Sequence, residues 1–169
     1  MKIKKILVAA AAVLVFSTCG FAKSIALQVV QVDSIQKEIR ASSVSVEEVI
    51  LDNLFLNGFI ATNSPIYSAD KINKIQAADK NGINEAKEGF CEYFISVVLN
   101  YKKGKDNRVE LNKLSMIKNA QWKIINVADG TVVASGEKSV GKVTSENDNK
   151  EGVQSFALKV AKDIGPFLK

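Results

Sequence analysis

The segment from Ala120 to Glu137, AQWKIINVADGTVVASGE, predicts a β-hairpin and decides how the rest of the chain is interpreted. A tryptophan begins a run rich in β-branched residues, Asp129-Gly130 follow, and a second β-branched run leads away. Asp-Gly between two such runs is a strong turn signal, because both residues tolerate the positive φ angles of tight hairpin turns. Antiparallel strands are therefore expected at Gln121–Val127 and Thr131–Val143.

Further elements are predicted on both sides of this hairpin. Apolar runs and alternation predict strands at Ser24–Val32, Phe59–Thr62, Phe90–Lys102 and Arg108–Lys118. Helical spacing predicts helices at Ser45–Asn57, at Asp70–Gly89 with a break at Asn81-Gly82, and at Gly152–Phe167. The first of these helices would begin with a capping box, Ser45 to Glu48.

The order of these elements predicts an α+β fold. We expect a single domain with a mainly antiparallel sheet of about five to six strands and about three helices packed on one face. In the hairpin, Trp122 and Ile124 share one face of the sheet and Ile125 and Val127 share the other. The second face therefore also needs cover, either from a partner or another copy, or from a loop of the chain itself.

The first 22 residues have the pattern of an export signal. Three lysines precede an uninterrupted apolar run, Ile6–Phe16 (ILVAAAAVLVF). Eleven residues rise about 16 Å as a helix, too short for a bilayer core of about 30 Å but typical of a signal peptide. Gly20 and Ala22 are small residues at the −3 and −1 positions of a cut before Lys23. Residues 1–22 are thus predicted to be a signal peptide cleaved after Ala22, and residues 23–169 a single α+β domain.

Cys19 gives a second way to process this signal, and the sequence leaves both open. A cysteine directly after the apolar run can take a lipid on its sulfur, although Phe16 and Thr18 depart from the residues that usually precede such a cysteine. Cleavage after Ala22 would release the protein, whereas lipid at Cys19 would attach it to a membrane. Under either alternative we expect an exported protein that is periplasmic or associated with the outer membrane.

Charge and cysteine content narrow the possible partners. Removal of residues 1–22 takes away three lysines and no acid, so the net charge falls from +5 to +2 over the remaining 147 residues. The remaining lysines are dispersed, which argues against binding to nucleic acid. Cys91 then has no cysteine to pair with, so the hydrophobic core must hold the domain together.

The composition argues against catalysis. The chain contains no histidine, which removes the most common general base and most zinc sites. The acidic loop Ser145–Glu151 lacks the spacing of a calcium loop, and no phosphate-binding loop motif is present. We therefore predict no catalytic residue, no cofactor and no metal ligand, and a protein that is not an enzyme.

Aromatic and apolar residues of two predicted strands form the candidate interaction surface. Its predicted members are Trp122, Ile124, Tyr93 and Tyr101. Aromatic side chains of this kind also line sites for small ligands. A periplasmic binding module for a small apolar or glycan ligand is therefore kept as the alternative.

Three stretches together resemble a known family of cell-envelope proteins. They are Ile50–Thr62, Ala86–Val97 and Trp122–Val133. The family has the curli-secretion-channel-like (CsgG-like) fold, shared by the flagellar outer-membrane accessory protein FlgO, the penicillin-binding-protein activator LpoB and the polysaccharide-secretion protein PelC. These relatives carry A-x-x-x-G-A-D-Y before a central strand and W-x-x-x-D-x-x-T-G across a hairpin. Here Phe90-Cys91-Glu92 replaces the Gly-Ala-Asp core, and Asp129-Gly130 stands at the turn.

The resemblance covers residues 25–168 and implies a role as well as a fold. Members of the family are mostly lipoproteins without enzymatic activity that scaffold or regulate envelope machines, several of them as rings. The resemblance thus implies an accessory protein of an envelope, secretion or flagellar assembly. Its partners would be envelope proteins or further copies of itself, and Cys19 would be the lipid site.

Overall fold

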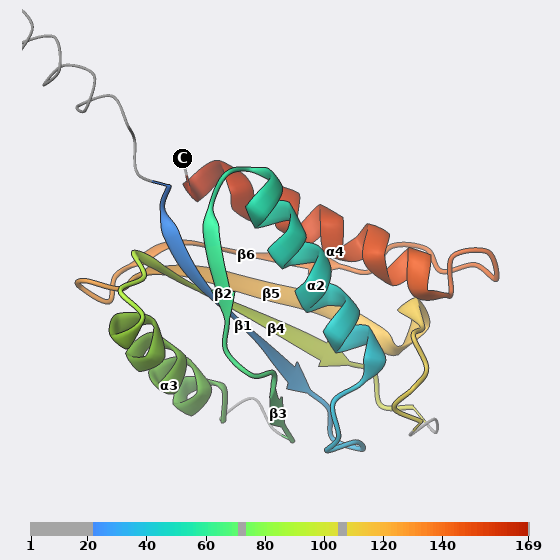
Figure 1. Cartoon of the computed structure of the whole chain (residues 1–169). Coiled ribbons are helices and arrows are strands. Elements are labelled where there is room, and N and C mark those ends of the chain that lie inside the picture. The colour runs from blue at the N-terminus through green and yellow to red at the C-terminus, as the bar shows by residue number, and fades with distance from the viewer. Residues whose placement is uncertain (1–21, 71–73, 105–107, 169) are drawn as a thin grey trace, which may run out of the picture.

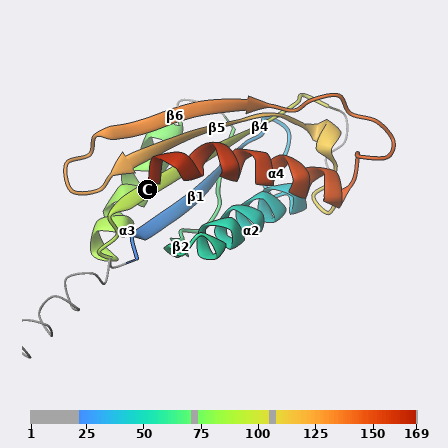
Figure 2. The same cartoon turned by 90° about the horizontal axis from the view of Figure 1, so that it is seen from above.

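The computed structural model describes residues 22–70, 74–104 and 108–168. A six-stranded mixed sheet lies between two layers of helices (Figures 1 and 2). The strands are β1 (Ser24–Val32), β2 (Ile60–Asn63), β3 (Tyr67–Ala69), β4 (Tyr93–Tyr101), β5 (Ile117–Asn126) and β6 (Val132–Ser139). The helices are α2 (Ala41–Leu56), α3 (Ile75–Glu88) and α4 (Lys150–Ile164), with short 3-10 turns η2 (Leu114–Met116) and η3 (Gly165–Leu168).

The sheet combines a parallel half with an antiparallel half. Its order is β2-β1-β4-β5-β6, and β3 also pairs with β1. β4, β5 and β6 form an antiparallel meander, which includes the hairpin predicted from Asp129-Gly130. β1 pairs in parallel with β2, β3 and β4, so that Ser24 lies opposite Ile60 and Ile25 lies opposite Tyr93. The first strand of the described chain is therefore an interior strand of the sheet.

Alternate residues of the strands point to two different helix layers. Ile25, Leu27 and Val29 of β1 belong to the main core, which β4 and β5 continue and which α2 and α4 cover. The intervening positions, such as Ala26, pack with Phe94 against α3 on the opposite face. Figure 1 shows α2 and α4 on one side of the sheet and α3 on the other.

The structure confirms the α+β class, the single domain, the six strands and the three helices. The predicted position of one helix is wrong. α3 does not share a face with α2 and α4. Its small residues Ala78, Gly82 and Ala86 recur at four-residue spacing, so one narrow side of the helix can approach the sheet closely. A Cβ atom on Gly82 would lie only 2.5 Å from the Phe94 ring. The apolar residues of this face are thus covered by α3, and neither a partner nor a loop is needed there.

Two predicted helix boundaries differ from the structure. α2 begins at Ala41, four residues before the predicted capping box, and the Ser45 hydroxyl instead accepts a hydrogen bond from Asn112 Nδ2 (2.6 Å). α3 continues through Asn81-Gly82, because the close packing on Phe94 compensates for the weak helix propensity of glycine. The end of α2 is as predicted, with Gly58 at a φ of +83° just beyond it.

The predicted strand at Arg108–Lys118 is also wrong for most of its length. β5 begins only at Ile117 and runs without a break into the Trp122 segment. The preceding residues turn through η2, where Asp148 fixes the chain. It accepts hydrogen bonds from the Ser115 backbone N–H (2.7 Å) and hydroxyl (2.8 Å). The contact of Ser115 with Asp148, 33 positions later in the sequence, therefore takes the place of the expected strand pairing.

Candidate functional site

Three of the four residues predicted as an interaction surface are buried. Ile124 is 0% exposed, Trp122 6% and Tyr101 9%, and all three belong to the core beneath α2 and α4. The prediction is wrong for them because their strand positions point to the helix-covered face. Tyr93 is half-buried, and Lys23 Nζ lies 5.5 Å from its ring centroid. Of the signal residues, Ala22 is exposed and Cys19 lies outside the described residues.

Trp122 is a packing residue that Gly136 accommodates. A Cβ atom on Gly136 would be 2.6 Å from the indole ring. The Phe167 ring lies on the same side, with the two ring centroids 5.8 Å apart. No stacking face of Trp122 is therefore available to a glycan, and the binding-module alternative loses its main residue.

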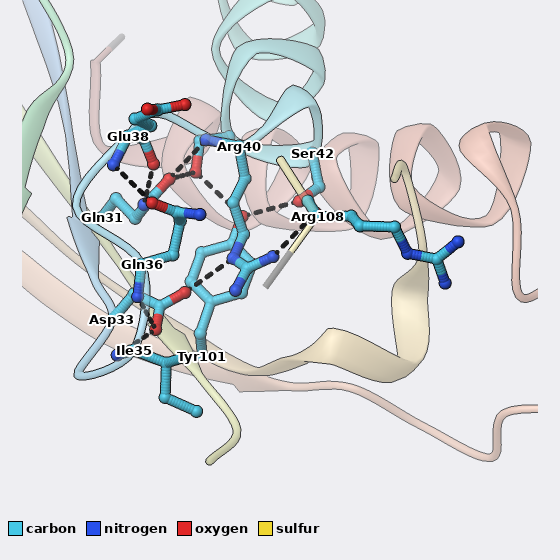
Figure 3. A network of polar contacts seen from close by, with 10 residues as sticks. Gln31, Asp33, Ile35, Gln36, Glu38, Arg40, Ser42, Tyr101 and Arg108 are labelled. Carbon is cyan, nitrogen blue, oxygen red and sulfur yellow. Dashed lines mark hydrogen bonds and ion pairs between the residues drawn. The ribbon is translucent and has the colours of Figure 1, made fainter. Parts of the chain in front are cut away.

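The loop between β1 and α2 encloses a buried ion pair (Figure 3). Arg40 Nε lies 2.6 Å from Asp33 Oδ2, and both side chains are almost fully buried. Asp33 Oδ1 accepts hydrogen bonds from the backbone N–H groups of Ile35 (2.9 Å) and Gln36 (3.1 Å). Arg40 also donates to the Arg108 carbonyl (3.1 Å) and lies over the Tyr101 ring. These contacts close the loop and attach it to a distant segment.

A second group of polar side chains continues from this ion pair to the start of α2. Gln31 Oε1 accepts from the Arg40 backbone N–H and from the Ser43 hydroxyl, both at 2.9 Å. The Tyr101 hydroxyl lies 2.7 Å from Ser42 Oγ and 2.8 Å from Ser43 Oγ. Burial raises the pKa of Tyr101, although the two serine hydroxyls oppose this, so the phenol stays protonated at neutral pH. The network is therefore a structural clamp that joins β1, α2 and β4.

This network was not predicted from the sequence, although one signal for it is present. Gln31 is a polar residue on the otherwise apolar main-core face of β1, and Asp33 directly follows the strand. A buried polar group needs partners, which the segment before α2 supplies. Those partners could not be identified, because the sequence predicts no element between Val32 and Ser45, where Arg40 lies.

A hollow of about 470 Å³ lies on the α3 face of the sheet, beside Ile75. Ser96 and Lys123 face each other across β4 and β5 in this hollow. The Lys123 ammonium donates to Asp79 Oδ2 of α3 at 2.5 Å, while the Ser96 hydroxyl has no hydrogen-bond partner among the described residues. A serine nucleophile needs a base that accepts its proton, and this ammonium is instead held by a carboxylate. The arrangement supports α3 on the sheet and does not activate Ser96.

Local hydrogen bonds hold two acids of the β5–β6 hairpin in the ionised form. The Thr131 backbone N–H (2.9 Å) and hydroxyl (2.7 Å) donate to Asp129 and lower its pKa. The amides of Asn119 and Gln121 donate to Glu137 and lower its pKa. Both acids are therefore anions, and as anions they accept the hydrogen bonds that stabilise the hairpin.

Burial works against the ionisation of Glu47 in α2. Desolvation raises the pKa of Glu47, a hydrogen bond from Asn63 opposes this, and Glu48 adds to the increase. Its Oε1 atom has no hydrogen-bond partner within residues 22–70, 74–104 and 108–168. Glu47 is therefore a small cost to stability at neutral pH.

Replacing Glu47 with glutamine should stabilise the protein at neutral pH. The folded state binds the proton more tightly than the unfolded chain, so stability falls as pH rises above 4.5, the ordinary value. Glu47→Gln removes this dependence and should raise the free energy of unfolding at pH 7 by about 1 kcal/mol. Urea denaturation at several pH values measures both effects. Equal changes at pH 4 and pH 7 would contradict the assignment, and exposed Asp52→Asn on the same helix is the control.

β6 is a long open edge of the sheet. Among the strands of the described ranges none pairs with its outer side. The opposite edge is divided into β2, with four residues, and β3, with three, and Pro65 lies between them. β6 has eight residues and begins with the exposed Val132 and Val133. Its free backbone groups can accept a further strand.

The part of the chain that the structure describes shows neither a metal cluster nor a membrane helix. Within it, no three His, Cys, Asp or Glu side chains come together as a metal site. None of its helices combines the length and the hydropathy that crossing a bilayer requires.

These features define a class: an α+β domain with a mixed sheet, a buried polar clamp and an open edge strand. The chain belongs to the family whose model is described as "Uncharacterised protein" and matches residues 24–169. No curated protein matches the chain.

Several solved structures are similar to this chain. The PelC dodecamer from Paraburkholderia phytofirmans is 18% identical, with a TM-score of 0.45 over 88% of this chain and 90% of that one. The lipoprotein GNA1162 from Neisseria meningitidis is 12% identical, with a TM-score of 0.49 over 85% and 99%. The LpoB C-terminal domain from Salmonella enterica is 15% identical, with a TM-score of 0.40 over 76% and 90%. PelC and LpoB also appear in the sequence resemblance, whereas the likeness to CsgG and FlgO remains a prediction.

Proposed function

We propose that the protein is an exported, non-enzymatic accessory protein of the cell envelope that acts by protein–protein contact. Residues 1–22 direct export, and the domain works in the periplasm or at the outer membrane. The observation that carries the proposal is the open edge of β6, eight residues long at one side of the sheet. A strand of a partner or of a second copy can pair with it through backbone hydrogen bonds.

The side chains favour a role in protein–protein contact over a role in catalysis. The polar groups around Arg40 are engaged with one another, and Lys123 is engaged with Asp79. The aromatic residues expected to bind a small ligand are mostly in the core. The exposed Val132 and Val133 lie instead at the start of the open strand. A partner that pairs with β6 would also cover these two side chains.

Cross-linking in the organism's own cells tests the proposal. A photo-reactive amino acid at Val133 should give a discrete heavier product, and the same group at exposed Lys80 on α3 should not. Val133→Lys places a charge at the open edge, which disfavours strand pairing, and should reduce complex formation about tenfold. Thr62→Lys on the short β2 edge is the matched control.

Two outcomes together would contradict the proposed function. They are a strictly monomeric mass in size exclusion with light scattering, and no product from the photo-reactive group at Val133. An adduct at Val133 of twice the chain mass would identify self-association, and a different mass would identify a separate envelope protein.

A further inference from the structure

The exposed apolar side chains are concentrated at one end of the molecule. Among the described residues, ten large hydrophobic side chains are exposed, and six of them lie at the same end of the sheet. The six are Phe55, Leu56, Ile60, Phe90, Val132 and Val133. We call this region the apolar end. Of the other four, Ile35 and Val44 lie toward the opposite end, Leu158 lies within α4, and Phe167 packs on Trp122 over the middle of β5.

The topology of the sheet creates this concentration. β1, β2 and β4 are parallel and begin at the apolar end, where β5 ends and β6 begins. α2 and α3 end there because each leads directly into one of these strands. η3 reaches the same end, since Lys23 Nζ donates to the Leu168 carbonyl at 3.0 Å. Figure 1 shows these turns together on the side where the chain enters β1.

Phe90 is held at the apolar end in an unfavourable backbone conformation. Its φ is +54°, in the left-handed region that bulky residues rarely adopt, and its side chain is 89% exposed. Glycine would adopt this conformation at lower cost. A fully exposed phenylalanine at such a position gains no packing in the folded monomer. The combination of this backbone strain with full exposure points to a functional role for the side chain.

The position of the N-terminus indicates what covers the apolar end. The described chain begins at Ala22, next to the start of β1 at this end, and the 21 residues before it in the sequence include the apolar run Ile6–Phe16 and Cys19. If lipid is attached at Cys19, the four peptide units to Lys23 span at most about 14 Å. The apolar end would then lie directly against the bilayer that holds the lipid.

The charges at the apolar end are balanced. Three basic residues, Lys23, Lys87 and Lys162, lie there together with three acidic ones, Glu88, Glu92 and Asp129. Attraction to anionic headgroups is therefore weak here, and apolar contact must supply the binding. Binding of this kind should depend little on salt concentration.

We propose that the apolar end contacts a lipid bilayer through Leu56, Phe90 and their apolar neighbours. This inference rests on the proposed export of the protein. It adds a second contact surface to the open edge of β6. With lipid at Cys19, the contact would orient the domain on the membrane. With cleavage after Ala22, the same side chains alone would give weak, reversible binding. In both cases, the start of β6 lies near the membrane surface.

Vesicle flotation of the mature protein tests this proposal. The protein is expressed as the full chain with Cys19→Ser, and the form cleaved after Ala22, identified by its mass, is used, so that neither a lipid nor the apolar run Ile6–Phe16 contributes to binding. It should float with vesicles of phosphatidylethanolamine and phosphatidylglycerol, at low and at high salt alike. Leu56→Ser with Phe90→Gly should reduce the bound fraction about tenfold, since two large apolar side chains are lost. Ile35→Ser with Val44→Ser is the matched control and should leave binding unchanged.

The stability of the variants separates a binding role from a folding role. Phe90→Gly relieves the positive φ and should leave the unfolding temperature unchanged or raise it. Absence of flotation by the Cys19→Ser protein would overturn the proposal, as would equal losses in both double variants. A smaller mass in light scattering for the Leu56/Phe90 variant would show that a second copy covers the apolar end, which also overturns it. Cross-links from Val133 are a separate readout, so the proposed function can survive this failure.

Discussion

Arg40→Met is expected to lower the free energy of unfolding by about 3–5 kcal/mol, as breaking a buried ion pair does. The substitution keeps the length of the side chain but leaves the Asp33 carboxylate buried without its counter-ion. It also removes the donor to the Arg108 carbonyl. Urea denaturation at pH 7, followed by circular dichroism, measures the loss.

Two further variants give this prediction its controls. Adding Asp33→Asn to Arg40→Met should recover part of the loss, because the amide oxygen can still accept from Ile35 and Gln36 without a buried charge. Lys138→Met breaks the partly exposed pair with Asp163 and should cost less than about 1 kcal/mol. Similar losses for Arg40→Met and Lys138→Met would show that the buried pair has no special role.

Trp122→Ala is expected to destabilise the protein by about 3–5 kcal/mol, the usual cost of emptying an aromatic site in a core. The ring fills the space above Gly136 and contacts Phe167, so its removal leaves a cavity between β5 and η3. A surface tryptophan would lose less than about 0.5 kcal/mol. Denaturant unfolding followed by circular dichroism distinguishes the two cases without the tryptophan signal.

Trp122→Phe and Val133→Ala complete this test. Phenylalanine keeps part of the apolar volume and should recover much of the stability. Val133 is exposed on β6, so its truncation should have little effect on the isolated protein. A loss from Trp122→Ala no larger than that from Val133→Ala would contradict the burial of the ring.

The sequence predicts most elements of this fold because their signals are local. β1 matches its predicted range of Ser24–Val32, and Asp129-Gly130 gives the hairpin. The parallel pairing of β1 with β4 has no such signal, since it joins segments that share no turn. The position of α3 depends on the fit of Gly82 against Phe94, which is a property of two elements in contact.

The candidate surface was predicted less well for a related reason. Trp122 and Ile124 were assigned correctly to one face of β5, but the sequence does not say which face the helices cover. A large α2–α4 layer over that face converts a presumed surface into core. The exposed residues that replace it include Leu56 at the end of α2 and Phe90 in the turn after α3, where apolar periodicity gives no signal.

The interior position of β1 has a consequence for how the chain reaches its folded form. Ser24 is among the first residues of the domain to be synthesised, yet its backbone bonds to Glu92, 68 positions later. The middle of the sheet therefore cannot assemble until about half of the domain has followed, and such distant pairings close slowly. During that interval β1 lacks the strand with which it shares its longest pairing, so completion of the sheet waits for the second half of the domain.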